Sequence, residues 1–174
     1  NLLDAVGETL KPRVRAVSQL KNTGAGSPDA GLYAVNQFAK GTSEPLPGQL
    51  PERGAVEIKS VAEDGWLTAG GAQVSKYREK YRLVLVTNYR DFLLVGEDRD
   101  GRPAVLETFR LADSADEFWA RLAQPRAFAQ ARGERLLEYL KRVLLCAAPL
   151  NNPRDVAWFL ASYARDARAR LAEK

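Results

Sequence analysis

An unbroken apolar run, Leu83-Val84-Leu85-Val86, limits what this chain can fold into more than any other feature of its sequence. A strand with one face in water alternates apolar and polar residues, whereas a continuous apolar run is typical of a central strand buried on both faces. A neighbouring strand is predicted over Asp91–Glu97, and the turn residues Asp98-Arg99-Asp100-Gly101 join it to a third strand, Pro103–Leu111. The sequence therefore predicts a sheet whose central strand is covered on both sides.

The segments before this strand alternate between helical and extended patterns. Apolar residues at helical spacing predict a helix over Asn1–Leu20 that Pro12 kinks or ends, and Val14 and Val17 continue its pattern. Two strands are expected next, with a proline-rich loop between them, followed by a second loop and a helix. In chain order these are the strand Gly31–Phe38, the loop Ala39–Gly54, the strand Ala55–Val61, the loop Ala62–Gly71 and the helix Ala72–Tyr81.

The last third of the chain has helical periodicity. Ser114 and Glu117 form a capping-box pattern before a helix over Ala115–Ala123, and a second helix is expected over Gly133–Cys146. Pro153 suits the first turn of a final helix, whose predicted buried residues are Val156, Phe159, Leu160 and Tyr163. The predicted fold is therefore α/β or α+β, with a core over residues 1–112 and a helical extension over residues 113–174.

Histidine is absent from the 174 residues, and this absence excludes more classes of function than any other compositional feature. Without imidazole there is no Ser-His-Asp or Cys-His catalysis, no histidine general base and no zinc site that uses histidine. The single cysteine, Cys146, excludes an internal disulfide framework, and its apolar surroundings predict a core position. The net charge of +4 agrees with a polyanionic partner without requiring one.

Two further observations concern the cell compartment and the extent of the chain. No apolar run approaches the roughly 20 residues of a membrane span, and the acidic Asp4 and Glu8 do not suit the start of a signal peptide. A cytoplasmic protein is the resulting expectation. Asn1 at the first position and the absence of methionine indicate a piece of a longer protein.

Polar residues that a simple fold does not require occur at three places. Asp29 stands at the mouth of a predicted strand. Glu57 and Lys59 lie two positions apart in the next strand, so their side chains are expected on the same face of it. Gln73 and Tyr77 lie four positions apart in the following helix and are expected on one helical face.

Together these residues have the chemistry needed to hydrolyse a phosphodiester without histidine. The carboxylates of Asp29 and Glu57 are hard oxygen ligands for Mg²⁺, and the carbonyl of Ile58 can add another. The metal lowers the pKa of a bound water and offsets phosphate charge, while Lys59 orients that water or stabilises the developing charge. The paired helical residues either hold the substrate strand or position the lysine by hydrogen bonds.

Each of these patterns also has a common structural explanation when it is taken alone. An acidic-x-Lys strand is more often a solvated face with a surface ion pair, and an aspartate after a proline is more often a turn residue. Gln73 alone is typical of a helix surface, and Tyr77 alone is typical of a core aromatic. The order of the patterns along consecutive elements favours the catalytic interpretation.

In this order the motifs resemble the signature of the PD-(D/E)xK nuclease superfamily, in the RecB-like variant that carries Gln-x-x-x-Tyr. The matching residues are Pro28-Asp29, Glu57-Ile58-Lys59 and Gln73 with Tyr77. The longer run from Gly54 to Phe118 is similar to the N-terminal nuclease-like domain of bacterial proteins that fuse a restriction endonuclease to an adenine-N6 DNA methyltransferase. That similarity is carried by the segments 54–59, 81–88, 91–96 and 106–111.

The resemblance implies a DNA endonuclease that uses Mg²⁺, or Mn²⁺ in its place, with a mixed sheet flanked by helices and the metal at the mouth of the central strands. The implied metal ligands are Asp29, Glu57 and the backbone of Ile58, and the implied catalytic residues also include Lys59, Gln73 and Tyr77. The superfamily often adds an acidic residue on the first helix, for which Glu8 is the candidate.

The resemblance also implies partners. These are DNA, a second copy of the chain in a homodimer, and methyltransferase and target-recognition domains outside this chain. The chain itself has no Asn-Pro-Pro-Tyr or Asp-Pro-Pro-Tyr motif of an adenine methylase.

Two other classes of function stay open on the sequence alone. The first is a non-catalytic DNA-binding or scaffold domain of a DNA methyltransferase, which keeps the fold without the activity. The second is a protein-interaction domain that docks a partner through an exposed apolar face on Gly133–Lys174. Metal binding that depends on Asp29 and Glu57 separates the nuclease from the scaffold.

Three weaker features have two explanations each. Trp66 either contacts DNA or caps the core. Arg90 either grips a phosphate or pairs with Asp91 or Asp98. The last helix carries a basic face, for which a solvated helix is the simpler explanation; its residues are Arg165, Arg168 and Arg170.

Overall fold

The computed structural model describes residues 1–22, 24–148, 150 and 153–172. Within them, six strands form one sheet whose spatial order follows the chain order. The strands are β1 (Val14–Ser18), β2 (Ala30–Ala34), β3 (Gly54–Ile58), β4 (Val84–Thr87), β5 (Asp91–Glu97) and β6 (Pro103–Arg110). Only β3 and β4 run parallel to each other, and the other neighbouring pairs are antiparallel. The sheet is therefore mixed, as expected.

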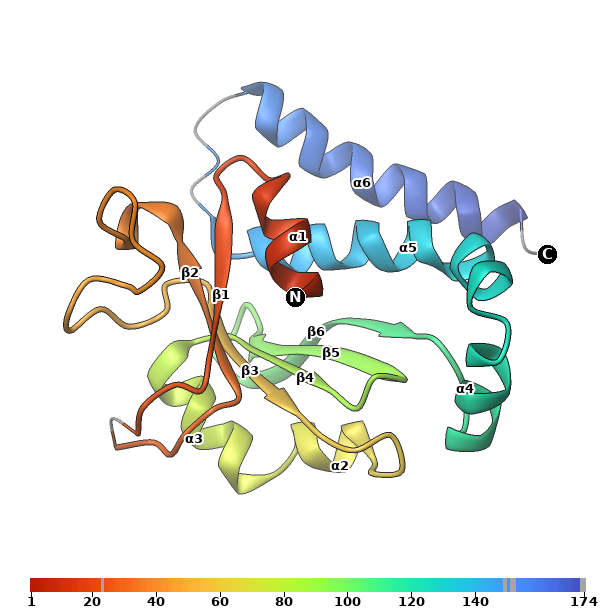
Figure 1. Cartoon of the computed structure of the whole chain (residues 1–174), viewed down its shortest axis with the longest axis horizontal. Helices are drawn as coiled ribbons and strands as arrows, with labels where there is room; N and C mark the ends of the chain where they lie inside the picture. Colours follow the sequence, from red (N-terminus) through yellow and green to blue (C-terminus); the bar gives the residue numbers. More distant parts are fainter. Residues whose placement is uncertain (23, 149, 151–152, 173–174) are drawn as a thin grey trace.

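Helices cover both faces of this sheet (Figure 1). The helices are α1 (Leu2–Glu8), α2 (Gly65–Ala69), α3 (Ala72–Tyr81), α4 (Ala115–Leu122), α5 (Pro125–Leu145) and α6 (Pro153–Ala172), and a single 3₁₀ turn covers Val35–Gln37. On one face lie α1 and α5, with α6 outside α5, and on the other lie α2 and α3. No helix among the described residues is both long enough and apolar enough to cross a bilayer.

Successive residues of the central strands point to opposite faces and enter two hydrophobic clusters. Val56 and Leu85 pack with the buried residues of α1 and α5. Ala55, Val84 and Val86 pack with α3. All four residues of β4 are buried, which confirms the central strand predicted from the apolar run. The predicted boundary at residue 112 precedes α5, yet α5 belongs to the same hydrophobic cluster as the strands.

The first predicted helix is wrong beyond Glu8, because the chain from Val14 to Ser18 is strand β1. This strand pairs with β2 from Val14 opposite Ala34 to Ser18 opposite Ala30. The spacing of Leu10, Val14 and Val17 suits a helix, but β1 completes the edge of the sheet and hydrogen-bonds its backbone to β2. By contrast, α3 and β5 have the predicted bounds.

Two helices depart from their predicted extent. The short helix α2 lies in a segment predicted as loop, and Asp64 caps it by accepting hydrogen bonds from the backbone N–H groups of Trp66 (2.8 Å) and Leu67 (3.1 Å). Helix α5 begins at Pro125, which suits a first-turn position, rather than at Gly133, and the helix continues through Gly133. Cys146, predicted in the core, is exposed just after α5.

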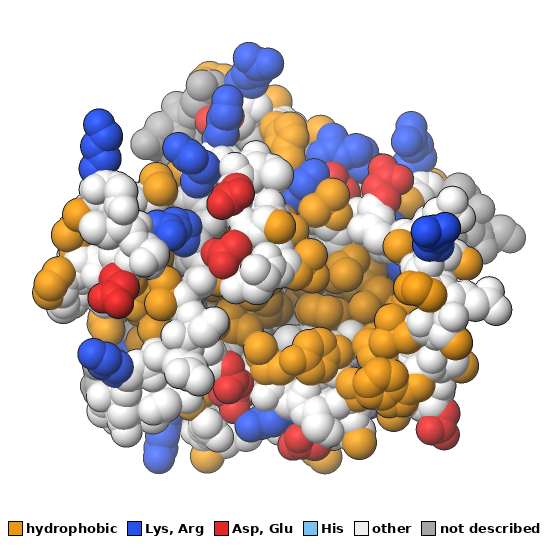
Figure 2. All heavy atoms as spheres, in the orientation of Figure 1, with side chains coloured by type: hydrophobic (Ala, Val, Ile, Leu, Met, Phe, Trp, Pro, Cys, Tyr) orange, Lys and Arg blue, Asp and Glu red, His pale blue; other side chains and the backbone are white. Residues whose placement is uncertain are grey.

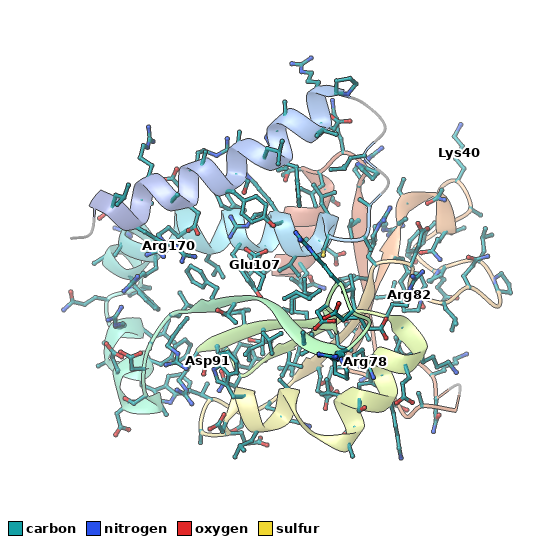
Figure 3. All side chains as sticks on the ribbon, turned by 180° about the vertical axis from the view of Figure 1, so that it is seen from behind. Lys40, Arg78, Arg82, Asp91, Glu107 and Arg170 are labelled. Atoms are coloured by element: carbon teal, nitrogen blue, oxygen red, sulfur yellow. The ribbon has the colours of Figure 1, made fainter. Side chains whose placement is uncertain are left out.

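The face that α6 turns inward differs in part from the prediction, since only Phe159 of the four predicted residues packs against the core. Val156, Leu160 and Tyr163 are exposed, whereas Ser162 and Asp166 are buried. The reason is a charged interface, because the buried Arg142 of α5 donates to Glu107 of β6 (2.6 Å) and to the Ser162 hydroxyl (3.2 Å). Glu107 lies between the sheet and α5 (Figure 3).

The basic face predicted for α6 is partly paired. Arg165 pairs with Glu138 at 2.9 Å, and Arg170 pairs with Asp166 at 2.7 Å. Arg165 therefore joins α6 to α5, whereas Arg170 pairs within α6 and its side chain is 58% exposed.

Candidate functional site

The sequence motifs meet where β3 ends. At this point β3 has β2 on one side, with Ala30 opposite Val56, and β4 on the other, with Ile58 opposite Thr87. Since β3 and β4 are parallel, their carboxyl ends lie at the same edge of the sheet, where ligands of open α/β sheets commonly bind. The side chains on the α2 and α3 face of this edge form the candidate site.

Asp29 lies beside the end of β3, just before β2. One carboxylate oxygen accepts a hydrogen bond from the Ile58 N–H at 2.7 Å, and the Asp29 carbonyl accepts one from the Gln19 N–H at 2.7 Å. The N–H and C=O of one strand residue point the same way, so the Ile58 carbonyl faces the edge that Asp29 occupies. The remaining Asp29 oxygen and this carbonyl are therefore suitable neighbours for one cation.

Glu57 and Lys59 share a face of β3, as the alternation predicted. The Lys59 ammonium donates to a Glu57 carboxylate oxygen at 2.7 Å. Only 4% of the Glu57 side chain is exposed, against 30% of the Lys59 side chain. The ion pair therefore has a buried acidic end and an accessible basic end.

Burial and like charges raise the pKa of Glu57 above its ordinary value. Burial is the main cause, the hydrogen bond from Lys59 opposes it, and the nearby carboxylates of Asp29 and Glu63 add to it. The hydrogen bond to Glu57 raises the pKa of Lys59. Lys59 consequently keeps its proton at neutral pH, and the Glu57 carboxyl takes up a proton more readily than a solvated glutamate.

Gln73 and Tyr77 meet on one face of α3, which confirms the predicted spacing. The Gln73 amide donates to the Tyr77 hydroxyl at 2.7 Å. Tyr77 is fully buried, so it contacts the chain rather than a solvent-borne substrate. A Cβ on Gly26 would lie 3.2 Å from its ring, which shows that Tyr77 packs against the loop that leads into Asp29. Tyr77 is therefore placed to position the loop, whereas Gln73, which holds its hydroxyl, lies on the exposed surface of α3.

The structure does not bring Glu8 to the site. Helix α1 packs with α5, on the face of the sheet opposite the Glu57 side chain. Within α1, Gly7 packs on the Val14 carbonyl, so Glu8 lies at the far end of β1 from Ser18, which pairs with Ala30 near Asp29. The expectation that Glu8 completes the ligand set is therefore not supported by its position.

Arg90 is held by backbone carbonyls. Its guanidinium donates to the carbonyls of Val61 (2.8 Å), Glu63 (3.3 Å) and Asp113 (3.1 Å), and it lies 3.8 Å from the Asp91 carboxylate. Of the two explanations for Arg90, pairing inside the chain is the one that the structure supports. Trp66, with 48% of its surface exposed, does not cap the core.

Two residues near the site were missed by the sequence reasoning. Glu63 accepts a hydrogen bond from the Ser60 N–H at 3.1 Å and places a further carboxylate near Glu57. Asn88 donates to the Glu63 carbonyl at 2.7 Å and so ties the end of β4 to the segment after Lys59. The Ser60-x-x-Glu63 spacing, which resembles a capping box, was the available signal for Glu63.

The donor set at the site fits a hard divalent cation in type, since it consists of two carboxylates and a backbone carbonyl without sulfur. It is also sparse. Within the described residues, no three acidic or cysteine side chains converge closely enough to hold a metal ion by themselves. A cation held by Asp29 and Glu57 would therefore take most of its ligands from backbone or water.

No family model, no curated protein and no solved structure matches this chain. The functional argument therefore depends on the geometry of the chain's own residues.

Proposed function

We propose that this chain is a metal-dependent deoxyribonuclease module that hydrolyses DNA phosphodiester bonds, within a bacterial restriction–modification or phage-defence polypeptide that also carries an adenine DNA methyltransferase. The observation that carries the proposal is the Glu57–Lys59 ion pair of 2.7 Å beside Asp29 at the end of two parallel strands. A mostly buried carboxylate paired with a partly exposed lysine is unusual for a solvated strand face, where both charges lie in water.

Asp29, Glu57 and the Ile58 carbonyl would hold Mg²⁺, or Mn²⁺ in its place. When bound, such an ion lowers the pKa of a coordinated water and offsets the charge of a phosphate. Lys59 lies within reach of the same space, and its ammonium stabilises negative charge that develops on the phosphate oxygens. The Gln73–Tyr77 pair holds the loop before Asp29 in place.

The test is cleavage of labelled DNA, single-stranded and duplex, with Mg²⁺ or Mn²⁺. We expect Glu57→Ala and Lys59→Ala to reduce cleavage by roughly a hundredfold or more, because each removes charge stabilisation at the reacting phosphate, while the far-UV circular dichroism stays native. Asp100→Ala, which removes an exposed ion pair with Arg102, serves as the matched control and should cleave normally. Undiminished cleavage by both site variants would refute the proposal.

The sparse ligand set favours a second candidate, a DNA-binding or scaffold domain of a DNA methyltransferase without nuclease activity. Calorimetric titration with Mn²⁺ separates the two candidates. A site that disappears in Asp29→Ala and Glu57→Ala supports the nuclease, whereas DNA binding without any such site supports the scaffold.

A further inference from the structure

Three large apolar side chains are exposed close to the candidate site. Trp66 and Leu67 on α2 have 48% and 77% of their surface exposed, and Tyr89, between β4 and β5, has 50% exposed. None of them belongs to either hydrophobic cluster. In Figure 2 the hollow ringed by hydrophobic side chains lies between α5 and the sheet, and charged groups lie at the lower margin, where α2 and α3 are in Figure 1, so the aromatic surface described here is separate from that hollow.

Tyr89 occupies a backbone position that suits a different residue. It is the middle residue of the three-residue connection between β4 and β5, Asn88 to Arg90, and its φ is 66°. Glycine is preferred at a positive φ in this position of a hairpin turn, because a Cβ there is crowded. Side-chain contacts do not compensate, since half of Tyr89 is in water. A tyrosine at this φ lowers the stability of the folded chain, and backbone strain of this kind is typical of residues at binding sites.

The turn that carries Tyr89 is fixed against the segment that follows Lys59. Asn88 accepts hydrogen bonds from the N–H groups of Arg90 (3.1 Å) and Asp91 (2.7 Å) and donates to the Glu63 carbonyl (2.7 Å). A Cβ on Gly65, the residue before Trp66, would lie 3.6 Å from the Asn88 amide. Asn88 therefore fixes the turn that carries Tyr89 against the segment over residues 63–66, and we call these two segments together the frame. Because both aromatic residues are attached to it, little ordering of the backbone is left to occur on binding.

The position of this frame relative to the charged pair follows from the strand register. The Lys59 N–H donates to the Thr87 carbonyl at 2.8 Å, and the Tyr89 N–H donates to the Thr87 hydroxyl at 3.0 Å. The aromatic ring of Tyr89 thus starts from the strand end next to Lys59. An aromatic surface joined to a phosphate-handling site matches one nucleotide, with its base on the ring and its phosphate at the lysine.

We propose that Trp66 and Tyr89 stack on an unpaired base next to the scissile phosphate, so that the site takes single-stranded DNA or duplex DNA whose bases are locally unpaired. In intact duplex DNA both faces of each base are covered by its neighbours, and only an unpaired base offers a face to a side chain. This inference rests on the proposed nuclease function, since it assigns the substrate of that site.

The test measures equilibrium binding in EDTA, which prevents cleavage, of the 174-residue chain to three fluorescein-labelled probes of equal length. The probes are oligothymidylate, a fully paired duplex and the same duplex with a central run of unpaired thymines. We expect oligothymidylate and the interrupted duplex to bind more tightly than the paired duplex. Trp66→Ala and Tyr89→Gly should each weaken binding to oligothymidylate by at least about fivefold, and Trp66→Phe should restore most of it.

Two controls separate binding from folding. Tyr89→Gly relieves the positive φ, so its melting temperature should equal or exceed that of the parent chain while its binding falls. Leu160→Ala removes an apolar side chain that is 61% exposed on α6, on the other face of the sheet, and should bind every probe like the parent.

Several outcomes would overturn the inference. Parental binding of oligothymidylate by both aromatic variants is one, and preferential binding of the fully paired duplex is another. Self-association that Trp66→Ala abolishes, without DNA binding, would assign the aromatic surface to a second copy of the chain instead. Loss of the probe preference is distinct from failure of the nuclease proposal, which is judged by metal-dependent cleavage and Glu57→Ala.

Discussion

At the scale of single residues, Glu57 sets the acid limit of metal binding. Its pKa is raised, chiefly by burial, so it becomes protonated at a pH above the ordinary value of about 4.3 for glutamate. A protonated carboxyl does not bind a hard cation, and protons therefore compete with the metal as the pH falls. We expect the affinity for Mn²⁺, measured by calorimetry, to decrease on the acid side at a higher pH than solvated carboxylates would produce.

The contribution of Glu57 to the free energy of unfolding changes with pH in the opposite direction to its contribution to metal affinity. A carboxyl whose pKa is raised by folding stabilises the native state below its unfolded pKa, and this stabilisation is lost as the pH rises through the folded value. Glu57→Gln, which cannot ionise, should therefore be destabilised less on going from acid to neutral pH than the parent chain. For the Mn²⁺ titration described above, an affinity that does not change with pH through this range would contradict the assignment of Glu57 as a ligand.

Two glycines give opposite expectations for the same substitution. Gly54 begins β3 at a φ of 108°, and a Cβ there would lie 2.5 Å from the Leu83 carbonyl oxygen. Gly54→Ala should lower the free energy of unfolding by at least about 2 kcal/mol. Gly133→Ala, inside α5 where a Cβ meets nothing, should raise it by about 1 kcal/mol. Urea unfolding measures both, and equal effects would contradict this account of β3.

At the scale of secondary structure elements, those helices and strands whose ends are marked by nearby turn residues were predicted correctly. The bounds of α3 and β5 follow from turn residues and periodicity on either side. Strand β1 could not be predicted, because Leu10, Val14 and Val17 fit helical spacing and only pairing with β2 decides between the alternatives. The inner face of α6 was missed in part for a similar reason, since Ser162 and Arg165 contact the charged side chains of Arg142 and Glu138 in α5.

The features of the candidate site also divide into those that local sequence patterns predict and those that depend on distant segments. Alternation and helical spacing predicted that Glu57 and Lys59 share one face and that Gln73 and Tyr77 share another, and the hydrogen bond within each pair confirms this. Periodicity does not determine which face of the sheet a distant helix covers, and the misplaced Glu8 reflects this. The carbonyls that bind Arg90 belong to Val61, Glu63 and Asp113, all of them more than twenty positions away in the sequence. No local sequence pattern predicts such contacts.

The contact of α6 with the rest of the chain depends on Arg142. Its side chain is 2% exposed and binds Glu107 of β6 and Ser162 of α6. We expect Arg142→Ala to lower the free energy of unfolding by about 3–5 kcal/mol, because it leaves Glu107 without its partner. Arg102→Ala, which breaks an exposed pair with Asp100, should change it by less than about 0.5 kcal/mol. Denaturant unfolding of both variants checks this, and similar losses would contradict it.

At the scale of the whole molecule, the predicted core of residues 1–112 is expected not to fold alone. It lacks α5, whose five most buried apolar residues line one face of the sheet: Tyr139, Leu140, Val143, Leu144 and Leu145. At about 2 kcal/mol each, their loss removes roughly 10 kcal/mol, comparable with the stability of an entire domain.

A fragment of residues 1–148 keeps these five side chains and should fold with reduced stability, because Arg142 loses its contact with Ser162. Circular dichroism with urea titration distinguishes the two fragments. Cooperative unfolding of residues 1–112 would show that the strands and the first three helices suffice.

The agreement between strand order and chain order has a consequence during synthesis on the ribosome. Every strand pairs with its neighbour in sequence, so the sheet can assemble progressively as the chain emerges, and all its pairings are available once Arg110 has left the exit tunnel. The face that α5 covers then stays open until Leu145 follows. In that interval the nascent chain presents a completed sheet with one apolar face in water, which is the stage at which it most needs a chaperone.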